Sequence, residues 1–488
     1  MKYLLGVDFG GGASKATLLE ETGRAAASAS SEYPTSYPRP GWAEQDPEDW
    51  YRAIRANIAA VLEKSGVSSA DIAAICLDAP THTAVLCGGD GEVLRPAIYW
   101  TDSRSIGETA ALREQADGMI LEQSLHRVDT IWTLPQLAWV KANEPEVWGK
   151  VRRIFFAKDY LRWRLTGEFA TDFIEAQGSM LFDCRKNAWS PELCGLIGLD
   201  TGLLPPLLRP SDSAGIVTAR AAGELGLRAG TPVVCGTTDT AMEILASGSI
   251  REGQMTVKLA TAGRICVITS RAWPSRHLVN YSHVKEGLWY PGTATKSAAA
   301  SYRWYRDTFG EDYRALDEGA ATVPPGAEGL FFHPYLSGEL TPYADPLLRG
   351  SFVGIRAGHT KAHFSRAVLE GVAYSLLACK KELEGLGIVH EPEARIIGGG
   401  AKSPLWRQIV ADMLGIPLLE VENSDSSLGA AMLAGVACGI FADFDEAAGK
   451  CTRIRSRTEP DKTVHSFYQS RAEIYEKIHD ALEPVYHL

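Results

Sequence analysis

Three short glycine-rich turns, each after a predicted strand, are the segments of this sequence best suited to chemistry. They are Gly10 to Gly12, Thr261 to Gly263 and Gly398 to Gly400. Glycine lets backbone N–H groups approach a phosphate, and a following helix N-terminus adds a favourable dipole. One such turn alone is commonly no more than a tight connection, so a phosphate site needs support from other residues.

Two aspartates give that support, because they follow buried strands. Asp8 ends the apolar run 3–8, and Asp239 comes directly after the run 233–238. Ligands of α/β folds bind beyond the carboxyl ends of strands. Each acid could also be structural, as a turn residue or a helix N-cap. Together with the three turns they indicate phosphate chemistry.

Other familiar sites are absent from the sequence. There is no G-x-x-x-x-G-K-[ST] loop and no G-x-S-x-G elbow. His359 and His363 have a spacing that metal ligands can use, but Thr360 replaces the glutamate of H-E-x-x-H and no third ligand is evident. Nine cysteines without a C-x-x-C pair predict reduced thiols.

The elements that must position these residues alternate between strands and helices, which indicates an α/β fold. Strands are expected at 3–8, 15–19, 72–77, 256–259, 265–268 and 394–397, and the segment 233–238 is expected to be a buried strand followed by a glycine turn. Helices are expected at 48–65, 135–166, 240–246, 364–383 and 404–414, with a final one after residue 426. The hairpins around the first two turns echo each other, as a duplicated architecture with one phosphate-facing hairpin per half would produce.

Composition narrows the function further. The 488 residues suggest two to three domains, and the seam between halves is expected near 247–255. Lys and Arg number 49 against 60 Asp and Glu, a net charge of −11, which argues against nucleic-acid or membrane-surface binding. No apolar run is long enough for a membrane helix and no signal peptide is evident, so a cytoplasmic protein is expected.

Longer motifs show a family resemblance that runs from about residue 3 to about residue 440. The segment 94–104 reads LRPAIYWTDSR, 158–168 reads KDYLRWRLTGE and 334–342 reads PYLSGELTP. Further matches are 350–370, 398–407 and 427–431. In this order the segments resemble the FGGY carbohydrate kinases, and among them the xylulokinase-like group.

The resemblance implies the two-domain actin and sugar-kinase fold, which is ribonuclease-H-like and has a central interdomain cleft. Residues 1–248 would form a domain that binds mainly sugar and carries the first phosphate hairpin. Residues 249–488 would form a domain that binds mainly nucleotide. The implied reaction is ATP-dependent, Mg²⁺-dependent phosphorylation of a small sugar, with D-xylulose and its 5-phosphate the nearest guess. A homodimer is possible, since dimers are common in the family.

The same resemblance assigns roles to individual residues. Asp239 is the expected general base and Asp8 the expected Mg²⁺-orienting acid. The phosphate-binding residues implied are Gly10, Gly12, Lys15, Thr261 and Gly263, and the adenosine-binding residues are Gly399, Gly400 and Ala401. The sugar-binding residues implied are Thr81, His82, Trp100, Asp102, Asp239 and Thr240. Trp100 could equally belong to the core, and Asp102 could form an ion pair with Arg104.

Departures from the family pattern leave the acceptor open. Gly11 and Ala262 stand where a threonine and a serine are usual, so two hydroxyl donors to phosphate are missing. Thr81 replaces a methionine and Thr240 an asparagine on the sugar side. Another pentulose, a tetrulose or a polyol therefore stays an alternative acceptor. Two other classes remain: a regulator that binds sugar without phosphorylating it, and an actin-like or heat-shock ATPase.

Overall fold

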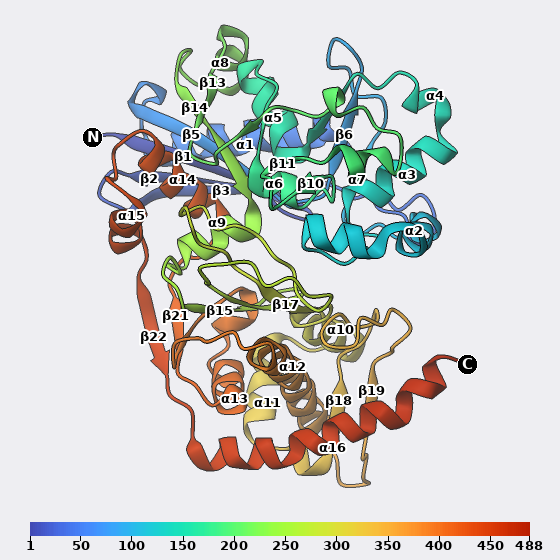
Figure 1. Ribbon diagram of the computed structural model, residues 1–488. Coiled ribbons are helices and arrows are strands. Elements are labelled where there is room, and N and C mark those ends of the chain that lie inside the picture. Colours follow the sequence, from blue (N-terminus) through green and yellow to red (C-terminus); the bar gives the residue numbers. More distant parts are fainter.

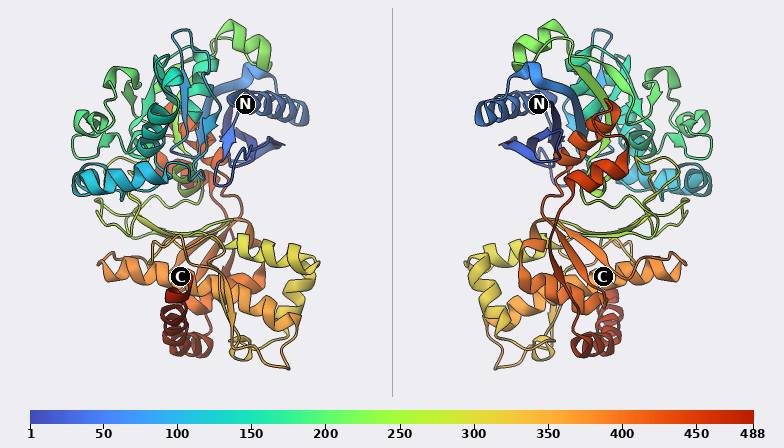
Figure 2. Two further views of the ribbon diagram at one scale, coloured as in Figure 1. Left: turned by 90° about the vertical axis from the view of Figure 1, so that its right-hand side faces the viewer. Right: turned by 90° about the vertical axis from the view of Figure 1, so that its left-hand side faces the viewer.

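The computed structural model describes residues 1–488 and shows two lobes, one above the other in Figure 1. Each lobe is built on a six-stranded mixed sheet. The N-terminal part of the chain forms the upper lobe, and most of the C-terminal part forms the lower one (Figures 1 and 2).

The first sheet has the strand order β13-β14-β5-β1-β2-β3. Its strands are β1 (Tyr3–Phe9), β2 (Ala13–Glu20), β3 (Ala25–Glu32), β5 (Ile72–Ala79), β13 (Ser213–Ile216) and β14 (Pro232–Thr238). β1, β2 and β3 form an antiparallel meander, β5 and β14 continue parallel to β1, and β13 closes the far edge antiparallel to β14. The parallel strands β1, β5 and β14 therefore end at the same edge of the sheet.

The second sheet has the order β17-β16-β15-β20-β21-β22 and repeats the same pattern of strand directions. Its strands are β15 (Met255–Leu259), β16 (Gly263–Val267), β17 (Gly292–Thr295), β20 (Ala394–Ile397), β21 (Leu418–Val421) and β22 (Ile454–Thr458). The duplicated hairpin expected from the sequence is confirmed, since β1–β2 and β15–β16 occupy equivalent places.

Helices and short strands surround the first sheet. The helices are α1 (Pro47–Ser65), α2 (Ile106–Ser124), α3 (Thr133–Asn143), α4 (Pro145–Trp148), α5 (Ala157–Thr166), α6 (Phe173–Gln177), α7 (Pro191–Gly195), α8 (Ala219–Leu225) and α9 (Asp239–Ala246). Two-stranded ribbons pair β4 (Glu44–Gln45) with β7 (Ala97–Ile98), β6 (Ala84–Cys87) with β8 (Arg153–Phe156), β9 (Thr171–Asp172) with β12 (Leu207–Leu208), and β10 (Phe182–Asp183) with β11 (Ala188–Trp189). Short 3₁₀ turns lie at Ser69–Asp71 and Thr201–Leu203.

The second sheet is covered mainly by a long buried helix, α12 (Lys361–Gly385). Around it lie α10 (Ala299–Phe309), α11 (Tyr313–Ala321), α13 (Pro404–Leu414) and α16 (Lys462–Tyr486). A ribbon pairs β18 (Phe331–His333) with β19 (Ser351–Val353), and 3₁₀ turns lie at Ala327–Gly329 and Gly399–Lys402.

Two late helices leave the lower lobe and return to the first sheet. α14 (Ser426–Ala437) packs on β1, β5 and α9, and α15 (Phe444–Cys451) packs beside it. In Figure 2 these late, red-toned segments lie among the blue strands of the upper lobe. A Cβ on Gly6 would come within 1.9 Å of the Ser427 carbonyl oxygen, so only glycine allows this close approach. The chain therefore passes between the lobes three times, around residues 247–254, 422–425 and 452–453.

Two sequence expectations need correction. The stretch 135–166 is not helical throughout, because α3 and α4 are followed by β8 before α5 begins. The apolar Ile154, Phe155 and Phe156 are buried where β8 pairs with β6, so pairing overrode the helical pattern. The helix after residue 426 is not the last one, since α15 and α16 follow it. All nine cysteines are free thiols, as expected. No helix combines the length and apolarity needed to cross a bilayer.

Candidate active site

Three carboxylates and a threonine come together where the parallel strands of the first sheet end. Asp8 on β1 lies in register with Asp78 on β5, and Asp78 lies in register with Thr237 on β14. Asp239 follows directly as the first residue of α9. Gly236 makes the approach of β14 possible, because a Cβ there would lie 2.0 Å from the Leu77 carbonyl oxygen.

Asp8 and Asp78 form a carboxyl pair in which three of the four oxygens have no hydrogen-bond partner. Asp78 is fully buried, and neither of its carboxylate oxygens, nor Oδ1 of Asp8, has a hydrogen-bond partner. Burial raises the pKa of Asp8 to about 7, and the negative charges of Asp239 and Glu243 act in the same direction. Burial, reinforced by the charge of Asp8, raises the pKa of Asp78 well above its ordinary value. A pair of this kind either shares a proton or takes up a cation.

Asp239 is held by the start of its own helix. Its Oδ1 accepts hydrogen bonds from the backbone N–H of Thr240 at 2.5 Å and from the Thr240 hydroxyl at 3.2 Å. The helix is capped by Thr238, whose hydroxyl accepts from the N–H of Ala241. Asp239 is half-buried, and its Oδ2 makes no hydrogen bond. The arrangement fixes the carboxylate and leaves one oxygen free to take a proton.

His82 has a left-handed backbone, with φ 79°, and both of its ring nitrogens are engaged. Nδ1 lies 2.6 Å from the carbonyl oxygen of Gly178, which can only accept, so Nδ1 carries the proton. Nε2 lies 2.7 Å from the hydroxyl of Thr81 and therefore accepts from it. Burial lowers the pKa of His82 to about 4 and keeps the ring neutral. Both ring nitrogens of His82 are therefore engaged, and the Thr81 hydroxyl oxygen is the atom at this position that can still accept a hydrogen bond.

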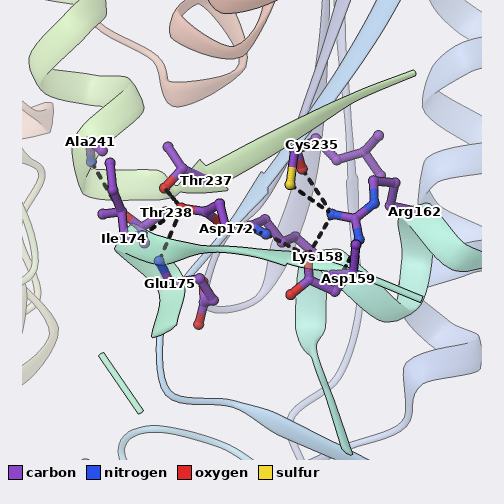
Figure 3. Close-up of polar contacts among 12 residues, drawn as sticks. Lys158, Asp159, Arg162, Asp172, Ile174, Glu175, Cys235, Thr237, Thr238 and Ala241 are labelled. Atoms are coloured by element: carbon purple, nitrogen blue, oxygen red, sulfur yellow. Dashed lines mark hydrogen bonds and ion pairs between the residues drawn. The ribbon is translucent and has the colours of Figure 1, made fainter. Parts of the chain in front are cut away.

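A buried network of charges lies against β14, the strand that leads into Asp239 (Figure 3). Lys158 Nζ lies 2.5 Å from Asp159 Oδ1 and 2.9 Å from Asp172 Oδ2. Arg162 Nη1 lies 2.7 Å from Asp159 Oδ1 and donates to the Cys235 carbonyl at 3.1 Å. All four charged side chains are fully buried, and their charges balance.

Asp172 is the centre of that connection. Its Oδ1 accepts from the N–H groups of Ile174 and Glu175, at 2.9 and 3.1 Å, and from the Thr237 hydroxyl at 2.8 Å. Glu175 in turn accepts from the N–H of His82 at 3.3 Å. Asp172 and Glu175 together therefore connect the strand before Asp239 to the loop that carries Thr81 and His82.

The lower lobe contributes the segment 278–290 to the same region. The hydroxyls of Tyr290 and Thr238 lie 3.5 Å apart, and the Gln177 side chain donates to Ser282 at 2.8 Å. A Cβ on Gly178 would come within 3.0 Å of the Tyr281 hydroxyl and 3.1 Å of the Thr81 side chain. The Tyr281 hydroxyl is buried without a partner. This region thus combines side chains from both lobes.

The side chain of Tyr99 lies close to the first predicted phosphate turn, Gly10 to Gly12. The backbone N–H of Gly10 donates to the Ala13 carbonyl at 2.8 Å, which closes the hairpin, and Gly11 and Gly12 are exposed. A Cβ on Gly11 would lie 3.0 Å from the Tyr99 hydroxyl. Lys15 makes an ion pair with Asp425, directly before α14, and is not a free surface lysine.

The second and third turns lie side by side. Thr261 is exposed, whereas Gly263 is buried, with a would-be Cβ only 2.6 Å from Thr295. Gly400 is packed against Leu259 at the end of β15, where a Cβ would meet Leu259 at 2.7 Å. Gly399 is exposed and Ala401 is buried. The structure therefore brings the predicted phosphate and adenosine segments together.

Two predicted sugar residues have other partners. Asp102 forms an ion pair with Arg104 at 2.8 Å and also accepts from the N–H groups of Arg104 and Ala43. The ion-pair interpretation of Asp102 and Arg104 is thus what the structure shows. Trp100 is half-buried beside Tyr99, with ring centroids 5.8 Å apart.

Sequence reasoning assigned no role to Asp78, Asp172 or Arg264. Asp78 could have been found from the sequence, because like Asp8 it stands near the end of an apolar strand. The other two depend on contacts between distant segments. A cavity of about 740 Å³ lies between α11, α13 and the start of α16, and none of the predicted site residues lines it.

Family models and solved structures of known proteins match nearly the whole chain. Residues 3–246 match the N-terminal domain model, and residues 233–438 the C-terminal domain model, of the FGGY family of carbohydrate kinases. A xylulose kinase of Bacillus subtilis is 32% identical over 98% of this chain and 97% of its own. A xylulose kinase structure from Brucella ovis has a TM-score of 0.90, with 31% identity over 99% of this chain and all of the other. A ligand-bound xylulose kinase from Lactobacillus acidophilus has a TM-score of 0.93, with 26% identity over all of this chain and 99% of the other.

Proposed function

The chain belongs to the FGGY family of carbohydrate kinases, and from this premise we propose that it transfers the terminal phosphoryl group of ATP to a ketopentose. D-xylulose, giving the 5-phosphate, is the first acceptor we propose, since the relatives compared are xylulose kinases. Another pentulose, a tetrulose or a polyol is the alternative within the same reaction.

The observation that carries this proposal is the position of Asp239. Its Oδ1 is held by Thr240, its Oδ2 is free, and it begins α9 directly after the end of β14, where Thr237 lies beside Asp78. A sugar hydroxyl is a poor nucleophile until a base accepts its proton. Asp239 Oδ2 accepts that proton while the hydroxyl oxygen bonds to the γ-phosphorus. The bond from the γ-phosphorus to the β–γ bridging oxygen breaks, and ADP leaves.

Nucleotide phosphates would bind between the two hairpin turns. Gly12 would supply an N–H group from one lobe, in a turn that the Gly10 N–H closes by donating to Ala13, and Thr261 and Gly263 would supply donors from the other. Gly399, Gly400 and Ala401 lie beside the second turn and would line the adenosine pocket. Lys15, held by Asp425, would add positive charge at the first turn.

Mg²⁺ fits the Asp8–Asp78 pair. Hard cations prefer carboxylate oxygens, and three of the four oxygens of this pair are buried without a partner. Bound there, Mg²⁺ would neutralise charge on the phosphates. Asp8 and Asp78 would be its ligands, and its positive charge would offset the repulsion between the two carboxylates.

The acceptor would contact Thr81 and the free Oδ2 oxygen of Asp239. Because His82 is neutral and donates to Gly178, it fixes the Thr81 hydroxyl rather than contacting sugar with both nitrogens. Thr240 keeps the base oriented through Oδ1. Trp100 is available as an apolar surface, whereas both oxygens of the buried Asp102 already accept hydrogen bonds from Arg104 or Ala43, so a contact with sugar would have to be added to these bonds.

The test is a coupled assay of ADP release with Mg·ATP and D-xylulose, ribulose, erythrulose, glycerol and xylitol, with a control lacking acceptor. Asp239→Asn should lower kcat by about 10²- to 10⁴-fold while the protein melts within a few degrees of wild type. Asp46→Asn, an exposed helix cap far along the chain, serves as the matched control. Full turnover by Asp239→Asn would refute the proposed base. Acceptor-independent ATP hydrolysis alone would favour an ATPase of another class.

A further inference from the structure

The side chain of Arg264 on β16 makes no hydrogen bond and no ion pair within the protein. Its guanidinium nitrogens Nε and Nη2 are buried and have no hydrogen-bond partner. The nearby Glu243 on α9 is already paired with Lys258, at 2.5 Å. An arginine cannot lose its proton, so a buried unpaired guanidinium is unfavourable unless an anion joins it.

The side chain of Arg264 lies on the face of the second sheet that is turned toward the first lobe. Gly263, its neighbour on the strand, would direct a Cβ at Thr295 and Leu376, and side chains of successive residues alternate between faces. Arg264 is also the register partner of Lys258, which reaches α9. Arg264 therefore points to the same side as that helix, of which Asp239 is the first residue.

The surroundings of Arg264 are those of the proposed acceptor site. Its Cζ lies 5.9 Å from the ring centroid of Tyr290, whose hydroxyl is 3.5 Å from that of Thr238. Asp239 contributes to raising the pKa of Arg264, and the charge of Arg264 contributes to lowering the pKa of His82.

The guanidinium also leans away from the second phosphate turn. A Cβ on Gly292 would lie 3.2 Å from Arg264 Nε, and Gly292 is the register partner of Cys266. Cys266 is two residues farther along β16, on the side opposite to the turn at 261–263. A phosphate held by that turn is therefore not the anion that this geometry favours.

We infer that Arg264 binds a carboxylate carried by the acceptor, so that the site takes sugar acids such as aldonates and keto-aldonates beside neutral pentuloses. The inference rests on the proposed function, because it concerns the acceptor of the same phosphoryl transfer. The carboxylate is a binding group only. A hydroxyl of the acid bonds to the γ-phosphorus, its proton passes to Asp239, and ADP leaves as with a pentulose.

The test compares acids with polyols that differ only in the carboxylate. Calorimetry would measure binding of D-xylonate against xylitol and D-gluconate against D-glucitol, with Mg·ADP present to occupy the phosphate turns. In wild type, at least one acid should bind about 10- to 100-fold tighter than its polyol, as expected for a charge-assisted hydrogen bond. Arg264→Gln should remove that preference, and Arg264→Lys should keep part of it. Arg314→Gln, an exposed arginine on α11, is the matched control.

The outcomes separate the two proposals. Equal affinity for acids and polyols in wild type, or an acid preference that persists in Arg264→Gln, would overturn the role of Arg264. Acid binding that disappears when Mg·ADP is added would also overturn it, because the acid would then occupy the phosphate turns. Failure of wild type to phosphorylate any neutral or acidic acceptor would instead overturn the proposed function. A Tm of Arg264→Gln within a few degrees of wild type, together with partial retention of the acid preference in Arg264→Lys, would show that the variant is folded and that the effect depends on charge.

Discussion

The balance of buried charge around Asp172 makes a quantitative prediction. Two cations, Lys158 and Arg162, are matched by two carboxylates, Asp159 and Asp172. Asp172→Asn preserves an oxygen that can still accept the three hydrogen bonds now made to Oδ1. It removes the charge that faces Lys158, leaving two buried cations for one carboxylate.

The expected loss follows from that imbalance. Breaking a buried ion pair by removing one partner destabilises a protein by about 3–5 kcal/mol. For a lobe of this size, about 4 kcal/mol corresponds to a fall of about 8 °C in Tm. Activity should fall as well, by about tenfold in kcat, because Thr237 and hence Asp239 lose part of their support.

A double-mutant cycle tests the reasoning. Lys158→Met combined with Asp172→Asn removes one charge of each sign and restores neutrality. Scanning calorimetry should therefore find the double variant less destabilised than the sum of the two single variants, by about 2 kcal/mol or more. Strictly additive losses, or an Asp172→Asn protein that melts within 2 °C of wild type, would refute the charge-balance account.

Three further predictions concern single residues. Gly11→Thr alone should leave the KM for ATP unimproved, because the added Cβ would lie 3.0 Å from the Tyr99 hydroxyl. Combined with Tyr99→Phe, the same substitution should lower the KM for ATP about fivefold through one added hydroxyl. Steady-state kinetics measure this, and an improvement in the single variant would contradict it. Thr81→Val should free Nε2 of His82 and raise the KM for the acceptor about five- to tenfold, while the KM for ATP stays constant. Equal changes in both KM values would contradict the assignment of Thr81 to the sugar side. Burial lowers the pKa of His283 from 6.5 to about 4, so the unfolded chain binds a proton that the folded protein does not, and the free energy of unfolding falls as pH drops through that window. His283→Gln should remove up to about 3 kcal/mol of that fall, measured by urea unfolding at pH 7 and pH 4.5, and an unchanged pH slope would contradict it.

The family and the two-lobe α/β fold could be predicted from the sequence, because their signals are local. Asp8 and Asp239 stand at strand ends beside glycine turns, and ordered motifs such as 158–168 carry the resemblance. The structure shows why that motif has its composition, since Lys158 and Arg162 supply the cations of the buried network.

Other features could not be predicted, since they depend on which distant residues meet. Arg264 follows a glycine turn and looks like an ordinary strand residue until its unpaired nitrogens and its neighbours are known. The strand β8 has the same apolar residues as a buried helix and is decided by its pairing with β6. The roles assigned to Thr81, Trp100, Asp102 and the glycine turns stay predictions.

The return of α14 to the first sheet has a consequence for synthesis of the chain on the ribosome. α14 covers β1 and β5 and packs on α9, with Gly429 close enough to Met242 that a Cβ would lie 2.0 Å from its carbonyl oxygen. Nearly the whole lower lobe must be translated before this helix emerges. Until then the completed strands of the upper lobe expose an apolar face, which is the kind of surface that chaperones bind. The upper lobe should therefore reach its native state only after residue 437 has been added, although its own strands are among the first made.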